Sequence, residues 1–168
     1  MLNIVLFEPE IPGNTGNIMR TCAGTGVHLH LIEPLGFRLN DSVIKRSGVN
    51  YIEHCQYTVY DDLEDFYAKN KGTFYYLTRY ATKSYHEINF TNKEENIYLV
   101  FGKESTGIPK EVLKENINNC FRIPTNSNIR ALNLSNCVAI TLFEALRQQD
   151  YNDLLVYDTE KGKDYLEK

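Results

Sequence analysis

Short apolar runs typical of β-strands alternate with segments of helical periodicity along most of the chain. Such alternation favours an α/β domain, in which helices connect the strands of a mostly parallel sheet. The runs predict strands at residues 3–7, 27–32, 73–78, 97–101 and 120–123. Helices are predicted at 17–23, 61–69, 110–116 and 133–149. The expected fold class is therefore α/β, with a mostly parallel sheet flanked by helices.

The last of these helices has the clearest pattern. Five apolar side chains recur at the spacing i, i+4, i+8, i+11 and i+12, namely Leu134, Val138, Leu142, Ala145 and Leu146. This spacing places them on one face of a helix, and Asn133 or Ser135 is a suitable N-cap. Such a stripe covers the chain's own sheet or packs against a second subunit, and periodicity does not separate the two.

The charge balance limits the classes of partner. The chain has 168 residues, with 18 Lys and Arg against 22 Asp and Glu, and a net charge of −4. This balance excludes a protein that coats nucleic acid indiscriminately. Much of the negative charge lies near the C-terminus, since residues 150–168 carry six acids and three lysines. We expect one domain over residues 1–150 and an acidic tail over 151–168, which leaves room for a locally basic surface.

Nothing in the sequence predicts export, a membrane anchor or a metal site. The apolar run at residues 4–7 is too short to span a bilayer and follows no basic leader. The four cysteines are widely spaced, without a Cys-x-x-Cys pair or histidines at zinc-ligand spacing. We therefore expect reduced thiols, a cytoplasmic location and no metal cofactor.

Three polar segments follow predicted strands, where α/β sheets gather their ligand sites. The first, residues 14–22, contains Asn14 and Arg20. A guanidinium fork suits phosphate oxygens, and a carboxamide both donates and accepts hydrogen bonds. The alternative is structural: Asn14 and Asn17 cap a helix while Arg20 forms a surface ion pair.

The second segment, residues 102–107, begins and ends with glycine and contains Glu104. It lacks the phosphate-binding P-loop order, because Gly107 is followed by Ile108 and Pro109, and the chain also lacks the Gly-x-Gly-x-x-Gly dinucleotide fingerprint. The third segment, residues 123–136, is a polar loop leading into the last helix. Its alternative interpretation is a surface loop with a helix cap, so no single segment identifies an activity.

Taken together and in this order, the segments resemble the three motifs of the SPOUT superfamily of S-adenosylmethionine-dependent RNA methyltransferases. The likeness is greatest to the TrmL/YibK-like branch, tRNA 2′-O-methyltransferases that act on the wobble cytidine or uridine. It rests on residues 2–6, 9–18 and Arg20, on 101–109, and on 123–124 with 132–136. The resemblance covers residues 1 to about 150 and implies a SPOUT fold with a deep C-terminal trefoil knot, although knots are rare among folds.

The resemblance also implies a site. S-adenosylmethionine, with S-adenosylhomocysteine as product, would lie against the backbone of three loops. The matching positions are Leu77, Thr78, Gly102, Glu104, Gly107, Ile123, Ala131, Leu132, Asn133 and Ser135. We expect a side chain at 102 to collide with such a ligand. Many relatives carry serine where this chain has Ala131, so any contact from 131 must come from the backbone.

Catalytic roles follow by the same resemblance for Arg20 and Asn14. Because a guanidinium rarely gives up its proton, we expect Arg20 to clamp a phosphate and to stabilise the nascent alkoxide. Asn14 is expected to orient Arg20. Glu104 is expected to shape its loop by accepting from the loop's own N–H groups, or to balance the charged groups of the ligand, with a role as base the less favoured alternative. The family implies a homodimer, packed through the helix at 17–23 and the last helix, with the active site near the subunit boundary.

The expected substrate is the anticodon stem-loop of tRNA. Phosphates would meet a basic patch, for which the candidates are Arg38, Lys45, Arg46, Arg122 and Arg130. Other functions remain open: a 2′-O-methyltransferase for ribosomal RNA or another tRNA position, a non-catalytic RNA-binding module of the same fold, and, third, a small-molecule oxidoreductase.

Overall fold

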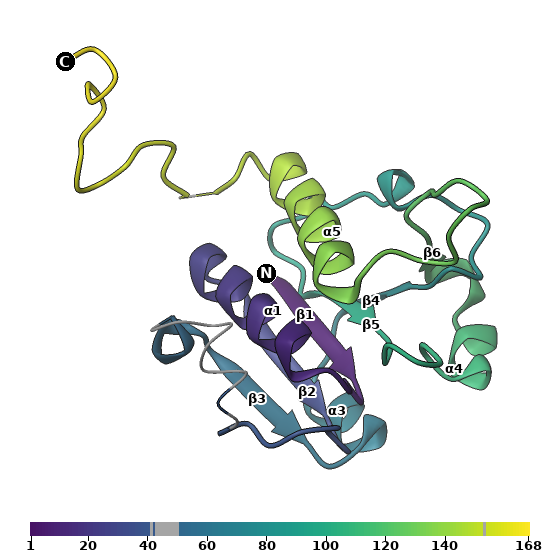
Figure 1. Cartoon of the computed structure of the whole chain (residues 1–168). Coiled ribbons are helices and arrows are strands. Elements are labelled where there is room, and N and C mark those ends of the chain that lie inside the picture. The colour runs from purple at the N-terminus through teal and green to yellow at the C-terminus, as the bar shows by residue number, and fades with distance from the viewer. Residues whose placement is uncertain (41, 43–50, 153) are drawn as a thin grey trace.

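A computed structural model describes residues 1–40, 42, 51–152 and 154–168. Within these residues, all six strands run parallel in one sheet of order β3-β2-β1-β5-β4-β6 (Figure 1). The strands are β1 (Leu2–Phe7), β2 (His28–Ile32), β3 (Tyr57–Tyr60), β4 (Thr73–Leu77), β5 (Ile97–Phe101) and β6 (Cys120–Phe121). The predicted α/β class with a parallel sheet is confirmed.

Helices cover both faces of this sheet. Helices α1 (Pro12–Thr25) and α5 (Leu134–Gln148) lie side by side on one face, as Figure 1 shows. Helices α3 (Leu63–Lys69) and α4 (Lys110–Glu115) pack on the other. Single 3-10 turns occur at η1 (Ile52–His54), η2 (Tyr85–Glu87) and η3 (Ile117–Asn119). Along β1 the buried side chains alternate between the two cores, as the pleat of a strand requires.

Helix α1 begins earlier than predicted. The helix was predicted to begin at residue 17, whereas residues 12–16 already form its first turns, with Pro12 at a position where its missing N–H costs nothing. The residue at the N-cap, Ile11, offers no capping side chain. The carboxylate of Glu104, from a distant loop, instead accepts from the N–H groups of Glu10 and Ile11. Local sequence rules miss this start because the stabilising group lies more than 90 residues away.

Other differences are smaller. Strand β3 was not predicted, and β6 ends two residues before the predicted 123. Pro109 occupies the N-cap of α4. Of the two predicted caps of α5, Asn133 is the one observed, and it accepts from the N–H groups of Ser135 and Asn136. Four of the five residues in the apolar stripe of α5 are buried in the core of this chain, and Leu134 is partly buried against the same core, so the stripe covers the chain's own sheet.

The sheet order places a crevice where ligands bind in open α/β folds. The connections from β1 lead outward through β2 to β3, whereas β5, β4 and β6 lie on its other side, so the topological switch point lies between β1 and β5. The connection from β4 to β5 contacts the end of β6 through Ser84 and Arg122 and the end of α5 through Phe90 and Gln148. The trefoil knot itself stays a prediction of the resemblance.

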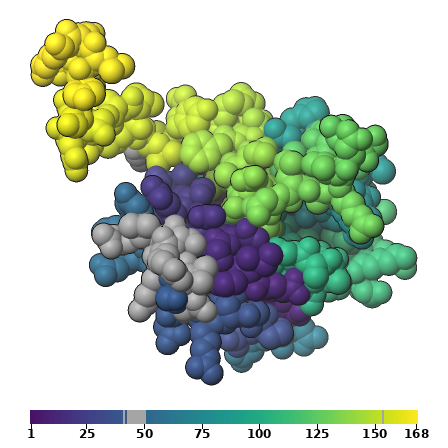
Figure 2. All heavy atoms as spheres, viewed as in Figure 1, coloured from purple at the N-terminus to yellow at the C-terminus, as the bar shows by residue number. Residues whose placement is uncertain are grey.

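The chain beyond α5 extends away from the body of the fold (Figure 1), and Figure 2 shows the last residues standing off as a separate lobe of atoms. Near its start, Leu154 packs against the core. The predicted division at residue 150 stays a prediction. None of the helices in the described part of the chain has the length and apolar character to span a bilayer.

Candidate active site

A cavity of about 530 Å³ opens at the carboxyl ends of the strands. Its walls come from the start of α1 and from the loops that follow β4, β5 and β6. The lining residues are Ile11, Asn14, 77–80, 101–108, 122–123, 125, 130–134 and Cys137. A volume of this size suits a single small ligand, and its position at the switch point is where α/β folds bind one.

Asn14 ties the walls of this cavity together. Its side-chain nitrogen donates to Glu104 Oε1 at 3.0 Å, and its side-chain oxygen accepts from Asn133 Nδ2 at 2.9 Å. Asn14 is buried, so these bonds replace the water that a carboxamide otherwise needs. The three sequence segments therefore meet at one side chain, and Asn14 positions them rather than capping a helix.

The loops after β1 and β5 are locked to each other by reciprocal hydrogen bonds. Glu104 Oε2 accepts from the Glu10 N–H at 2.8 Å, and Glu10 in return accepts from the N–H and hydroxyl of Ser105, both at 2.8 Å. The Ser105 hydroxyl, and then its N–H, lower the pKa of the Glu10 carboxyl. Lys103 adds an ion pair with Glu8. The expectation that Glu104 accepts from its own loop was wrong, because the donors belong to Glu10, Ile11 and Asn14.

Gly102 is required by its own loop. A Cβ added at this position would lie 2.2 Å from both the Gly107 carbonyl carbon and the Ile108 nitrogen. Gly107 has φ +76°, a left-handed conformation that favours glycine. The expected reason, a collision with a ligand, was therefore incomplete, because a side chain at 102 already collides with residues 107 and 108.

Cationic side chains surround the cavity. Arg79 and Tyr80 follow β4, and the Arg79 guanidinium donates to the Tyr80 hydroxyl at 2.7 Å. Arg122 and Arg130 contribute from the third loop. The Nε atom of Arg122 is buried without a hydrogen-bond partner among the described residues, which leaves a donor for an anionic group of a ligand. Arg79 and Tyr80 were not among the predicted site residues, although their position directly after the strand predicted at 73–78 is a usable signal.

The structure brings together nine of the ten predicted cofactor residues. Those lining the cavity are Leu77, Thr78, Gly102, Glu104, Gly107, Ile123, Ala131, Leu132 and Asn133. Ser135 does not line it, because its hydroxyl turns back to donate to Asn133 Oδ1 at 2.6 Å. Of the predicted RNA contacts, Arg130 lines the cavity and Arg38 is exposed elsewhere, whereas Lys45 and Arg46 lie outside the described residues.

Arg20 lies outside the cavity of its own chain. It is exposed on α1, six residues beyond Asn14, and its guanidinium lies 4.9 Å from the centre of the Tyr51 ring. No ion pair with Arg20 occurs among the described residues, so the alternative of a surface ion pair finds no support there. Arg20 and Asn14 share a helix but are not in contact through any hydrogen bond in this part of the chain.

The four cysteines are free thiols, and burial raises the pKa of each, to about 11 for Cys55. In the residues that the structure describes, no group of three or more His, Cys, Asp or Glu side chains is placed to hold a metal ion.

Known proteins share this architecture. A tRNA (cytidine(34)-2′-O)-methyltransferase of Saccharophagus degradans is 45% identical over 150 residues, covering 88% of this chain and 96% of that protein. A structure described as giving insights into 2-OH methylation of C/U34 on tRNA has a TM-score of 0.83 and 38% identity, covering 89% of this chain and 97% of the other. An AdoMet-bound rRNA methyltransferase from Sinorhizobium meliloti has a TM-score of 0.77 and 25% identity over 87% of this chain and 56% of its own.

The parallel sheet and the cavity at its switch point define an α/β protein with room for a small ligand between three interlocked loops. Within that class the chain belongs to the SpoU rRNA Methylase family, whose model matches residues 1–143. The match includes α1 and all three loops of the cavity, and it ends inside α5.

Proposed function

We propose that this protein transfers a methyl group from S-adenosylmethionine to the ribose 2′-hydroxyl of nucleotide 34, the wobble cytidine or uridine, in the anticodon stem-loop of tRNA. The observation that carries the proposal is the cavity whose three walls Asn14 joins. Family membership and the activity named for the Saccharophagus degradans relative support the chemistry and the position on tRNA. A tRNA substrate also favours a cytoplasmic location.

The cavity suits S-adenosylmethionine. Its wall is apolar at Leu77, Ile108 and Leu132, which gives an adenine ring a place to pack. The unpartnered Nε of Arg122 offers a donor to the carboxylate of the methionine portion. When bound, this group supplies a methyl already activated by its sulfonium, so the protein's own task is to position the acceptor and manage the charge that develops on its oxygen.

Arg20 carries that second task in our proposal. It clamps the phosphate next to the target ribose and stabilises the developing alkoxide, while the proton leaves to phosphate or water. Asn14 acts as a positioning residue, because both polar atoms of its side chain are already bonded to Glu104 and Asn133.

We further propose a homodimer, since Arg20 lies outside the cavity of its own chain. The outer face of α5 exposes 36% of Ile140 and 46% of Phe143, and α1, which carries Arg20, lies beside it. Pairing this face with a second copy would cover the apolar side chains and carry Arg20 of the partner subunit toward the cavity. This exposed face takes the place of the buried stripe as the dimer contact.

Incubation with labelled S-adenosylmethionine and total RNA, followed by mapping of the modified ribose, tests the reaction. We expect label at position 34 of tRNA. Label confined to ribosomal RNA would contradict the tRNA assignment, and label in no RNA would contradict the enzymatic function. Light scattering tests the dimer, and a monomer at micromolar concentration would refute it.

Mixing two inactive variants tests whether the sites are shared. Arg20→Ala and Gly102→Val each remove a different part of a composite site. If the dimer builds each site from both subunits, co-refolding the pair restores one intact site in each mixed dimer and so restores activity. If mixed dimers are shown to form and activity does not recover, Arg20 does not belong to a site shared between subunits.

A further inference from the structure

A second cavity, of about 960 Å³, adjoins the first. The two share the lining residues Thr78, Tyr80, Lys103, Thr106, Gly107 and Ile108. The second cavity continues from these residues over α4 and η3. A ligand lying in it would therefore run directly up to the candidate active site.

Four lysines line this second cavity, namely Lys83, Lys103, Lys110 and Lys114, and no aspartate or glutamate does so in the described part of the chain. Lys103 is neutralised by Glu8, whereas the other three form no ion pair within that part. Three unpaired cations at one place are unexpected in a chain with a net charge of −4. The region is locally basic, and none of its lysines was among the RNA contacts expected from sequence.

The lysines are arranged for binding rather than scattered. Lys110 and Lys114 are four residues apart on α4 and so share one face of that helix. The neighbouring acid Glu115 lies on the side of α4 that faces α3. Burial raises the pKa of Tyr67, a residue of α3, and the negative charge of Glu115 raises that pKa further, which indicates that the two groups are close. Lys83 donates to the Asn118 carbonyl at 2.9 Å, a bond that fixes its position without cancelling its charge.

The floor of the second cavity is apolar. Ala81, Ile108, Leu113, Ile117 and Cys120 contribute to it. Single-stranded nucleic acid needs both features, because its bases pack on apolar or aromatic surface while its phosphates pair with lysine and arginine. An acidic peptide would match the charge of the lysines, but its carboxylates would not pack on the apolar floor.

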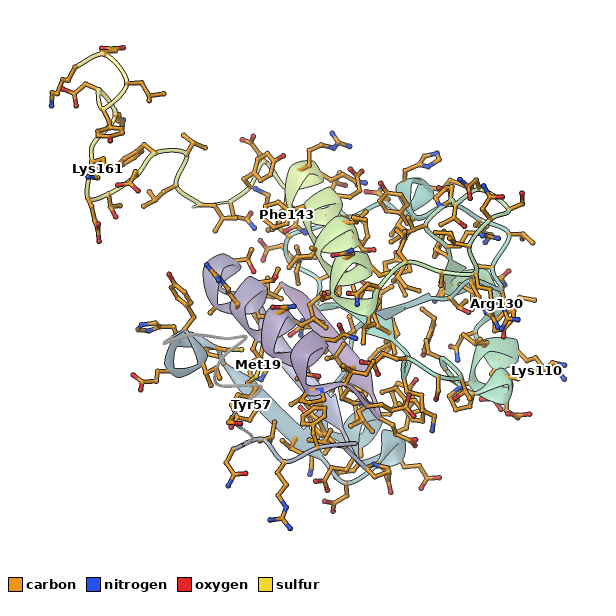
Figure 3. The ribbon with its side chains drawn as sticks, viewed as in Figure 1. Met19, Tyr57, Lys110, Arg130, Phe143 and Lys161 are labelled. Carbon is orange, nitrogen blue, oxygen red and sulfur yellow. The ribbon has the colours of Figure 1, made fainter. Side chains whose placement is uncertain are left out.

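We propose that this lysine groove, formed by Lys83, Lys110 and Lys114 around that floor, binds the single-stranded RNA next to the nucleotide that is methylated. The inference rests on the proposed function and names a surface through which that function selects its substrate. Phosphates pair with the three ammonium groups, and at least one base packs on the floor. Figure 3 shows Lys110 and Arg130 projecting on the same side of the molecule, and Arg130 lines the first cavity. The RNA thus passes from the groove to the cavity.

The test variant is the double substitution Lys110→Gln/Lys114→Gln, which is compared with the wild type. A second variant, Lys110→Arg/Lys114→Arg, keeps both charges, and a control, Lys161→Gln/Lys163→Gln, removes two charges from the tail. Three quantities are measured: the salt dependence of tRNA affinity, the KM and kcat of methylation, and the affinity for S-adenosylmethionine alone. We expect the glutamine pair to make the slope of log affinity against log salt shallower by about 1.4, two single-strand phosphate contacts at about 0.7 each.

We also expect the glutamine pair to raise KM for tRNA severalfold, with kcat and cofactor affinity unchanged, and the arginine pair and tail control to behave like the wild type. An unchanged slope and KM in the glutamine pair would overturn the groove while leaving the methyltransferase intact. The same change of slope and KM in the tail control would mean that net charge alone causes the effect, and this result would also overturn the groove. A wild type that binds S-adenosylmethionine but methylates no tRNA would refute the proposed function, and with it this inference.

Discussion

Asn133 donates from its side-chain nitrogen to the side-chain oxygen of Asn14 at 2.9 Å, although 119 residues separate them in sequence. The same Asn133 caps α5 with its other polar atom, which accepts from the N–H groups of Ser135 and Asn136. One carboxamide therefore starts the last helix and closes the cavity. Stability and ligand binding are coupled at this pair, and substitutions there should affect both.

Asn14→Asp should destabilise the protein by about 2–4 kcal/mol, because it places a second carboxylate against Glu104 in a buried network. Denaturant unfolding measures the loss, and titration with S-adenosylmethionine should show weakened binding. Asn17→Asp, on the exposed side of the same helix, serves as the control. Equal stability of the two variants would contradict the bridging role of Asn14.

Glu104→Gln separates positioning from proton transfer. Both carboxylate oxygens of Glu104 accept hydrogen bonds, and in glutamine one of them is replaced by an NH2 group that cannot accept. At least one of these bonds is lost, so we expect a loss of about 1–3 kcal/mol in the free energy of unfolding. If Glu104 positions the loops and does not act as the base, the pH profile of the remaining methylation should keep its shape. Glu111→Gln, at an exposed carboxylate, is the control. Loss of one limb of the profile in Glu104→Gln would assign proton transfer to this residue.

The glycines offer a matched pair. Gly102→Ala forces a Cβ to within 2.2 Å of the Gly107 and Ile108 backbone. This substitution should lower the free energy of unfolding by about 1–3 kcal/mol and weaken cofactor binding. Gly24 lies in α1 with nothing within 4 Å of an added Cβ, so Gly24→Ala should raise the free energy of unfolding by about 0.5–1 kcal/mol. Thermal unfolding of both variants checks the opposite signs. A neutral Gly102→Ala would mean that the loop can rearrange.

Arg20→Lys keeps the charge but removes the planar fork. If the guanidinium clamps phosphate and alkoxide together, kcat/KM for tRNA should fall roughly a hundredfold while S-adenosylmethionine binds normally. Arg147→Lys, at an exposed arginine of α5, should have no comparable effect. Activity near the wild-type value in Arg20→Lys would indicate that a point charge is enough.

His30 should make stability depend on pH. Burial, and then the nearby charge of His28, lower the pKa of His30 to about 4, and its ring bonds to Tyr60 and Asn3. Because the unfolded chain binds this proton near pH 6.5, stability is complete above that pH and falls by about 3 kcal/mol as pH drops toward 4. His30→Gln should flatten the decline measured by denaturant unfolding between pH 4 and 7. An unchanged slope would assign the decline to other groups.

Sequence reasoning identified what depends on local patterns. It predicted the five strands with clear apolar runs and the last helix with its cap, but it missed β3, in which only Tyr60 of the four residues is buried. It placed the start of α1 wrongly because Glu104, which meets the N–H groups just before that helix, is brought there only by the tertiary fold.

The positions around the cavity came from a resemblance, since no spacing rule links residues 14, 104 and 133. Arg79 and Tyr80 line the cavity but belong to none of the three motifs on which that resemblance rests. The lysine groove was equally hidden, because its lysines lie on separate segments that only the fold assembles.

The third wall of the cavity, residues 122–134, lies in the last third of the chain. A nascent chain that has left the ribosome only as far as β5 already contains the centre of the sheet, yet Asn14 still lacks Asn133 as a partner. The site therefore appears late in synthesis, and incomplete chains cannot carry it. A copy that ends before Asn133 lacks the third wall, so we expect it to transfer no methyl group.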